Sequence, residues 1–283
     1  MRVKLLKLSE REHVFLETMH HITSDGWSWG VFHRELVTLY DAYRQGRDNP
    51  LKPLTVQYAD FALWQRQWLA GGAPDEGLKY WKKQLEGIPE ELELAADRPR
   101  HGMQTFKAEV FESPAPAHQA AALKQLAIDN KATLYITLLA AFGVLLSRYS
   151  GQDDIVVGSP IANRQDAQLE KMIGFFVNML VTRMRINPES SFAQLLAEVR
   201  DTTFEAYEHK DIPFERLVEE LSPKRSLNLT PVFQVGFALQ SVPWEVAQPP
   251  EAPLKIGALC RRRGSSSFLP RSSRLADTGP ARF

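Results

Sequence analysis

The spacing of apolar residues changes several times along the chain, and each change predicts an element. "VKLLKL" at 3–8 and "HVFLETMHHI" at 13–22 have the length and composition of strands, and the polar "SERE" between them predicts a hairpin. From Trp29 onward, apolar residues recur at helical spacing, and Gly46 follows as a stop. The first fifty residues are therefore expected to form a hairpin followed by a helix.

Four aromatic side chains recur three or four residues apart after the proline-rich "NPLKPL". They are Tyr58, Phe61, Trp64 and Trp68. This spacing predicts a helix from about Val56 with the aromatic rings on one face. Such a stripe is core more often than it is a ligand-binding box, so we interpret it as the face that holds the helix to its domain. Another helix is expected around Tyr80 and Leu85.

Strands and helices alternate in the second half of the chain. Helices are expected at about 116–130, 133–149, 191–209 and 213–221, with Ser191 and Asp211 as caps, and strands at 106–111, 155–162, 175–186 and 231–239. This alternation is typical of the α/β class.

A polar stretch with proline and glycine, "AADRPRHGMQ" at 95–104, predicts a linker between two domains, 1–94 and 105–245. The composition then changes. From Pro253 to the end, seven basic residues stand against one acid, and no apolar period is present. The segment 246–283 is therefore expected to be disordered.

Charge and cysteine content exclude some classes of partner. Lys plus Arg equals Asp plus Glu at 34 each, which gives no electrostatic reason to expect nucleic acid or an acidic membrane. The longest apolar run, 134–146, is shorter than the ~20 residues of a membrane span and predicts a buried helix. One cysteine, Cys260, allows no intrachain disulfide, so a cytoplasmic protein is expected.

The stretch "MHHITSDGWSWG" at 19–30 contains the most suggestive chemistry, two adjacent histidines followed by Asp-Gly. If the strand continues through them, the two imidazoles point to opposite faces, which argues against a two-histidine metal site. Asp25 then fixes an imidazole, braces the loop or caps the next helix, and Gly26 permits a sharp turn or an unusual backbone angle. These residues alone leave open whether the stretch is a site or a strand end.

The motif and those that follow it resemble a known family. "HHITSDGW" fits the HHxxxDG signature of the condensation domains of nonribosomal peptide synthetases. "YADFALWQRQW", "DDIVVGSPIANR", "IGFFVNMLVTR", "HKDIPFERLVEEL" and "TPVFQVGFALQ" resemble the later motifs of that family, in order. Carnitine and chloramphenicol acyltransferases share only the shorter HxxxDG, so the six motifs together, over Val3–Gln240, carry the resemblance.

The resemblance implies a two-lobed chloramphenicol-acetyltransferase-like fold with the active site in a tunnel where the lobes join. A donor aminoacyl or peptidyl thioester arrives on the phosphopantetheine of an upstream carrier protein, and an acceptor aminoacyl thioester arrives on a downstream one. The domain joins them through an amide bond, as an acyltransferase of secondary metabolism. It implies no bound cofactor and no metal, and as partners the two peptidyl carrier proteins and the adenylation domains of the assembly line.

The resemblance also assigns roles to the histidine motif. His21 is the tunnel-facing imidazole, which deprotonates the acceptor amine or orients it, and His20 is structural. Asp25 is expected to brace the loop through a buried ion pair, because a buried carboxylate without a partner is costly. The candidate partner is Arg164, at the end of "GSPIANR".

Two further residues are candidates by position in the family motifs. The N–H of Gly26 is expected to point at the thioester oxygen. Asn178, in "FFVNM", is expected to contact either pantetheine or the backbone, and a cross-strand hydrogen bond is an equal alternative.

The motif also indicates a subtype. "HHITSDGWS" favours a domain that joins L-residues, because epimerisation domains usually lack Trp27 and heterocyclisation domains have aspartate in place of the histidines. The first motifs of the family are absent, so the first lobe is expected to be incomplete, and the second incomplete at its end. The alternatives are a truncated, non-catalytic remnant or an epimerisation-type relative.

Overall fold

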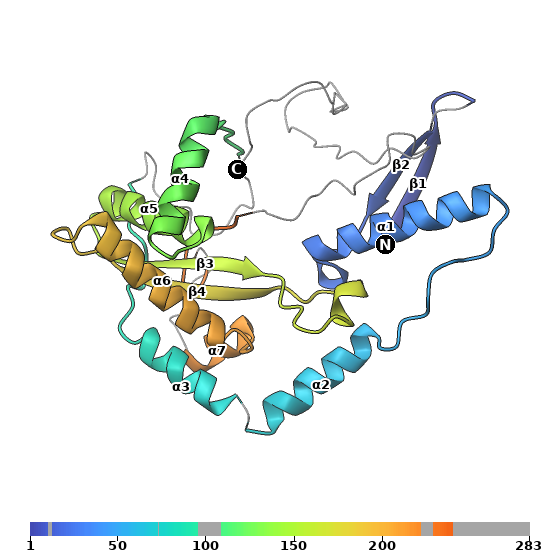
Figure 1. Ribbon diagram of the computed structural model, residues 1–283. Coiled ribbons are helices and arrows are strands. Elements are labelled where there is room, and N and C mark those ends of the chain that lie inside the picture. Colours follow the sequence, from blue (N-terminus) through green and yellow to red (C-terminus); the bar gives the residue numbers. More distant parts are fainter. Residues whose placement is uncertain (11–12, 73, 96–108, 222–228, 240–283) are drawn as a thin grey trace. The chain divides into compact units, whose positions relative to one another are not determined.

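A computed structural model of the chain describes residues 1–10, 13–72, 74–95, 109–221 and 229–239 (Figure 1). These residues group into two compact units. Unit 1 consists of Met1–Arg66 and Arg164–Val177, and unit 2 of Gln67–Asn163 and the described part of 178–240. Each unit is thus built from two separate stretches of chain.

This grouping does not follow the single boundary expected from the sequence. It assigns residues 67–95 to the same unit as 109–163, and the segment 164–177 to the other unit. The predicted linker 95–104 lies outside the described residues except for its first position, as do residues 106–108 of a predicted strand and the whole predicted tail 246–283. The division into domains at 95–104 therefore stays a prediction.

Unit 1 begins with the predicted hairpin. Strand β1 (Arg2–Lys7) pairs with β2 (His13–Thr18) in antiparallel register, from Arg2 opposite Thr18 to Lys7 opposite His13. The second strand ends at Thr18, whereas the sequence predicted it to run to residue 22. A short 3-10 helix, η1 (His21–Thr23), follows instead. The histidine pair therefore lies beyond the strand.

The remaining elements of unit 1 are a long helix, the start of a second helix and a returning segment. Helix α1 (Gly26–Arg44) confirms the first predicted helix, and the stop at Gly46 has a left-handed φ of 69°. Helix α2 (Tyr58–Ala70) begins in unit 1 and ends in unit 2. The returning segment, Arg164–Val177, contains the 3-10 turn η2 (Leu169–Lys171).

The aromatic stripe of α2 is only partly core. The rings of Tyr58 and Phe61 pack against Phe176, at centroid distances of 5.2 and 4.8 Å. Trp64 is 55% exposed, and Trp68 packs against the buried cluster of unit 2. The predicted single packing face is therefore divided between the two units, and Trp64 is about half exposed.

Unit 2 combines a mixed three-stranded sheet with helices, in agreement with the predicted α/β class. β3 (Asp154–Ile161) is the central strand, antiparallel to β4 (Asn178–Arg185) and parallel to β5 (Val235–Gly236). The helices are α3 (Asp75–Gln84), α4 (Ala117–Asp129), α5 (Leu134–Ser150), α6 (Phe192–Glu208) and α7 (Phe214–Leu221).

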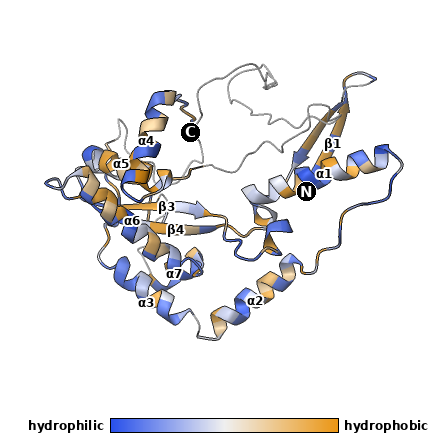
Figure 2. Cartoon of the chain, viewed as in Figure 1, coloured by the Kyte–Doolittle hydropathy of each residue, from blue (hydrophilic) through white to orange (hydrophobic). Residues whose placement is uncertain are grey.

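Both faces of the central strand are buried, which explains its continuous apolar run. Ile155 and Val157 belong to one cluster with α5 and α6, and Val156 belongs to a second cluster with α3 and α7. The apolar helix α5 stands out in the hydropathy colouring (Figure 2). The predicted cap of α6 is also present, because Ser191 and Gln194 form a reciprocal capping box.

Two predicted strands of this region are shorter than expected. The strand expected at 175–186 begins only at Asn178, since the Phe176 N–H bonds to the carboxylate of Asp25 instead of a neighbouring strand. The strand expected at 231–239 is reduced to Val235–Gly236. Of the described helices, none alone has the length and apolarity to cross a membrane; α4 and α5, bent by 102°, pass that test only as a pair.

A half-buried tyrosine in unit 2, Tyr80, gives a testable alkaline response. The Tyr80 hydroxyl has no hydrogen-bond partner among the described residues, and its ring stacks on His209 at 4.1 Å. Burial raises the pKa of Tyr80, and the nearby Glu205 and Glu208 raise it further. The folded state therefore holds this proton more tightly than the unfolded chain, so the free energy of unfolding falls as pH rises above about 10.

Replacing Tyr80 with phenylalanine should remove this contribution. For Tyr80→Phe we expect unchanged or higher stability at pH 7, because an unpaired buried hydroxyl is lost, and a shallower alkaline decline. Urea unfolding between pH 7 and pH 11 measures both. Burial also raises the pKa of Tyr58 and of Tyr135, so part of the decline should remain. An alkaline slope identical to that of the wild type would contradict the prediction.

Candidate active site

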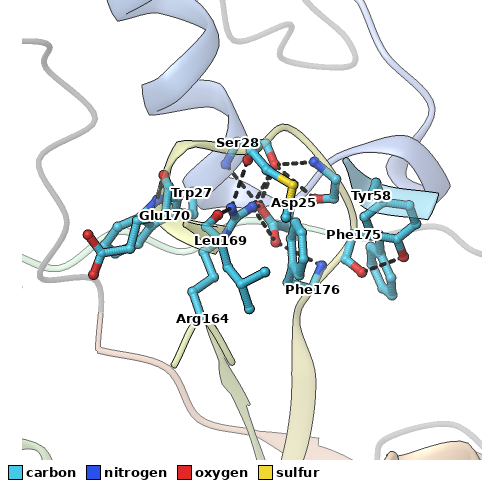
Figure 3. A network of polar contacts seen from close by, with 11 residues as sticks. Asp25, Trp27, Ser28, Tyr58, Arg164, Leu169, Glu170, Phe175 and Phe176 are labelled. Atoms are coloured by element: carbon cyan, nitrogen blue, oxygen red, sulfur yellow. Dashed lines mark hydrogen bonds and ion pairs between the residues drawn. The ribbon is translucent and has the colours of Figure 1, made fainter. Parts of the chain in front are cut away.

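Asp25 lies at the centre of a buried polar network at the start of α1 (Figure 3). The residue is 3% exposed and is the N-cap of the helix. Its Oδ1 accepts hydrogen bonds from the backbone N–H and the hydroxyl of Ser28, at 2.8 and 2.7 Å. Its Oδ2 accepts the backbone N–H of Phe176 at 3.0 Å. A carboxylate here satisfies a free helix N–H and complements the helix dipole.

Arg164 completes the network as the ion-pair partner of Asp25. Its Nη2 donates to Oδ1 and Oδ2 of Asp25 at 3.0 and 3.2 Å, with the two side chains 1% and 4% exposed. Its Nη1 donates to the carbonyls of Leu169 and Met172. The Phe176 ring lies 4.1 Å from the guanidinium carbon. Asp25 is thus both a helix cap and half of the predicted ion pair. On the sequence alone, capping the helix and bracing the loop were alternative roles.

The electrostatics of this pair follow from its burial. Desolvation lowers the pKa of the Arg164 guanidinium, and the Asp25 carboxylate acts in the opposite direction. Each member therefore needs the other, because either charge alone would be buried without compensation.

Ser28 is a site residue that the sequence reasoning missed. It is fully buried, and its Oγ lies within hydrogen-bonding distance of Asp25, of Arg164 Nη2 at 3.0 Å, and of the carbonyl and N–H of Gly174 at 2.8 and 3.0 Å. The single hydroxyl hydrogen goes to the Asp25 carboxylate or to the Gly174 carbonyl, whereas Arg164 Nη2 and the Gly174 N–H donate to the hydroxyl oxygen. The available signal was the spacing from Asp25 to Ser28, the N-cap and N3 positions of a helix.

The returning segment 164–177 is tied to the rest of unit 1 along its length. The indole N–H of Trp27 donates to the carbonyl of Glu170 at 2.9 Å, and the Tyr58 hydroxyl donates to the carbonyl of Phe175 at 2.8 Å. At Gly174 an added Cβ would lie 2.3 Å from the Tyr58 ring, so only glycine fits there. Burial and the charge of Asp25 raise the pKa of Tyr58, so its hydroxyl remains a donor.

The two histidines differ, but not for the reason the sequence suggested. The prediction of a strand through both is wrong, so alternating faces do not separate them. His20 caps η1, and its Nδ1 accepts the N–H of Ile22 at 3.1 Å. This local bond turns the chain out of the extended conformation. The His21 ring meets Phe175 edge-to-face at 5.4 Å, and no described residue forms a hydrogen bond with its nitrogens.

Gly26 is the first residue of α1, and of the two features that the sequence allowed for it, a sharp turn or an unusual backbone angle, it does not adopt the second. It is not among the described glycines with positive φ. As the residue directly after the cap, it presents one of the N–H groups that have no partner within the helix.

Asn178 makes structural hydrogen bonds with all of its side-chain groups. Its Nδ2 donates to the carbonyls of Lys210 and Ile212, both at 2.8 Å, and its Oδ1 accepts the N–H groups of Met179 and Phe214 at 2.8 and 3.0 Å. These four bonds use the full hydrogen-bonding capacity of the amide and all go to the backbone, which was one of the predicted contacts, whereas the contact with pantetheine stays a prediction. The side chain holds the loop before α7 to the start of β4, and it is neither a cross-strand contact nor a described part of the network around Asp25.

The described residues contain no group of three or more His, Cys, Asp or Glu side chains arranged to hold a metal ion.

Known proteins are similar to this chain in both sequence and fold. The condensation-domain family model matches residues 1–257. The chain belongs to the condensation-domain family. This condensation domain is 48% identical over 245 residues to a linear gramicidin synthase of Brevibacillus parabrevis, covering 87% of the chain and 3% of the synthase. It is 46% identical over 259 residues to malpibaldin synthetase of Mortierella alpina, covering 92% and 5%.

Solved structures agree with this assignment. The X-domain from teicoplanin biosynthesis superposes with a TM-score of 0.78 at 34% identity, over 83% of this chain and 53% of that one. A four-domain nonribosomal peptide synthetase bound to AMP and glycine gives 0.75 at 26% identity, over 86% and 18%. The fold is therefore the chloramphenicol-acetyltransferase-like α/β fold of condensation domains. The chain spans about half of the X-domain and a small fraction of the synthetases.

Proposed function

We propose that this condensation domain forms an amide bond between two carrier-bound substrates, with His21 meeting the acceptor amine. The amine nitrogen attacks the carbonyl carbon of the donor thioester, the C–N bond forms, the C–S bond breaks, and the donor carrier's thiol is released. The observation that carries the proposal is the state of His21. Among the described residues its imidazole nitrogens have no hydrogen bond, beside a rigid network that engages the neighbouring carboxylate.

Asp25 is not suited to be the base of this reaction. Both of its oxygens accept hydrogen bonds from Arg164, and each also accepts from backbone N–H groups. These donors occupy both carboxylate oxygens, so the carboxylate braces the loop. The proton of the amine is then taken or oriented by His21, and the N–H of Gly26 at the positive end of α1 is the proposed donor to the thioester oxygen.

The partners, the location and the L-type subtype are inferred from membership of the family. We infer upstream donor and downstream acceptor peptidyl carrier proteins and the adenylation domains of the same assembly line as partners, and the cytoplasm as the location. The L-type subtype is supported by Trp27 in the motif. Trp27 also has a structural role in this chain, because its indole N–H donates a hydrogen bond to the carbonyl of Glu170.

Two loaded carriers test the function directly. The purified protein is mixed with a donor carrier and an acceptor carrier, each charged with an L-aminoacyl group, and the acceptor pantetheine is analysed by mass spectrometry. We expect a dipeptidyl thioester on the acceptor, with little product from a D-aminoacyl donor. Epimerised aminoacyl groups without amide would favour the epimerisation-type alternative, and no product from any pair would favour the non-catalytic one.

A further inference from the structure

Three consecutive residues near the end of the returning segment contact three different parts of the site, and Figure 3 shows two of them, Phe175 and Phe176, beside Tyr58 and Asp25. Gly174 exchanges hydrogen bonds with the hydroxyl of Ser28. The ring of Phe175 meets the ring of His21 at an interplanar angle of 81°. The N–H of Phe176 donates to Asp25. The buried network and the exposed histidine are therefore connected through this short stretch of backbone.

The peptide group between Phe175 and Phe176 is held on both of its polar atoms. Its carbonyl oxygen accepts the hydroxyl of Tyr58 at 2.8 Å, and its N–H donates to Oδ2 of Asp25 at 3.0 Å. Fixing this peptide plane restricts the backbone of Phe175 and hence the direction of its ring. Tyr58 is itself close-packed against Gly174, where a side chain would clash.

His21 depends on this arrangement because it has few other constraints. The residue is exposed, and no hydrogen bond from the described residues fixes its ring. An edge-to-face contact is a preferred geometry for aromatic rings and limits rotation of the imidazole. Among the described residues no hydrogen bond or ion pair joins Asp25 to the His21 ring, so the influence of Asp25 on the imidazole passes through the clamped peptide group.

We propose that Phe175 is a positioning residue for His21, and that Tyr58 and Asp25 clamp the Phe175–Phe176 peptide group so that the Phe175 ring holds the imidazole in one orientation. The proposal rests on the proposed function for its kinetic consequences. It assigns Asp25 an effect on catalysis without any contact with substrate.

Four variants separate positioning from packing in kinetic assays. Phe175→Leu removes the aromatic contact but keeps an apolar side chain, Phe175→Tyr restores the ring, and Tyr58→Phe removes only the hydrogen bond to the clamped peptide. The control is Phe32→Leu, which disturbs a ring cluster of unit 1 formed with Trp29 and His33 that includes none of the clamp residues. Misplacement of a reacting group by about 1 Å is associated with losses near 10²-fold.

We expect Phe175→Leu to lower kcat by about 10- to 100-fold with KM nearly unchanged, and Tyr58→Phe to lower it by a smaller factor. Phe175→Tyr should restore most of the rate. Phe32→Leu should lower the melting temperature while kcat stays near the wild-type value. Equal kcat losses in Phe175→Leu and Phe32→Leu would mean that Phe175 contributes only general packing, and would overturn the proposal.

A second readout does not depend on the reaction. The protein is labelled on its histidine rings, and the NMR signals of His21 are assigned with His21→Gln. These signals should shift and broaden in Phe175→Leu and in Tyr58→Phe, and stay in place in Phe32→Leu. Unchanged His21 signals in Phe175→Leu would contradict the positioning of His21 by Phe175, even if the protein forms amide bonds. Should Phe175→Leu fail to fold, Tyr58→Phe alone decides, since it removes one hydrogen bond. If the wild type forms no amide, the proposed function fails while the NMR comparison still tests the positioning.

Discussion

His21→Ala is expected to lower the rate of amide formation by about 10²–10⁴-fold, the usual contribution of a group that moves or orients a proton. The His21 ring makes no hydrogen bond with any described residue, so its removal takes away the group assigned to the acceptor amine and little of the fold. The measurement is the steady-state rate of dipeptidyl transfer between loaded carriers.

The matched control is His20→Asn. The Nδ1 of His20 accepts the N–H of Ile22 as the cap of η1, and an asparagine oxygen is a good acceptor in that position. The turn should therefore persist, and the rate should stay within about threefold of the wild type if His20 is structural. Losses of the same size in both variants would contradict the separate roles of the two histidines.

Asp25→Asn should destabilise the protein by about 3–5 kcal/mol, because it leaves Arg164 buried without its counter-charge. The change preserves the shape of the side chain, so the decrease in the free energy of unfolding measures the effect of removing the negative charge. Denaturant unfolding followed by tryptophan fluorescence measures the free energy, and the rate of amide formation should fall in parallel.

Two comparisons sharpen this second prediction. Combining Asp25→Asn with Arg164→Gln should cost less than the sum of the two single changes, because the double variant leaves no unpaired charge. Arg47→Gln removes an exposed pair with Asp41 in the same unit and should change stability by less than about 1 kcal/mol. A large rate loss for Asp25→Asn without any loss of stability would mean that Asp25 takes part directly in the chemistry.

Much of the fold could be predicted because its signals are local. The hairpin, the apolar helix α5 and the capping box at Ser191 follow from spacing and turn chemistry within a few residues. The Asp25–Arg164 pair is long-range, yet it could be proposed because a buried carboxylate needs a cation and a family motif ends in arginine.

The incorrect predictions have a common physical origin. The periodicity of apolar residues does not show which acceptor a backbone N–H will hydrogen-bond to. Residues 19–22 have the composition of a strand, but the N–H of Ile22 donates its hydrogen bond to the His20 side chain instead of to a neighbouring strand. Phe176 has strand character, but its N–H goes to Asp25. Ser28 was missed because its main partners, Gly174 and Arg164, lie far away in sequence.

The discontinuity of unit 1 has a consequence for the order in which the nascent chain folds. Its first stretch ends at Arg66 and its second begins at Arg164, so residues 67–163 must be synthesised in between. At translation rates of about 5–20 residues per second, that interval lasts about 5–20 s. Throughout it, Asp25 has neither Arg164 nor the N–H of Phe176. The surroundings of His21 are therefore completed late, only after the ribosome has produced the chain as far as Phe176.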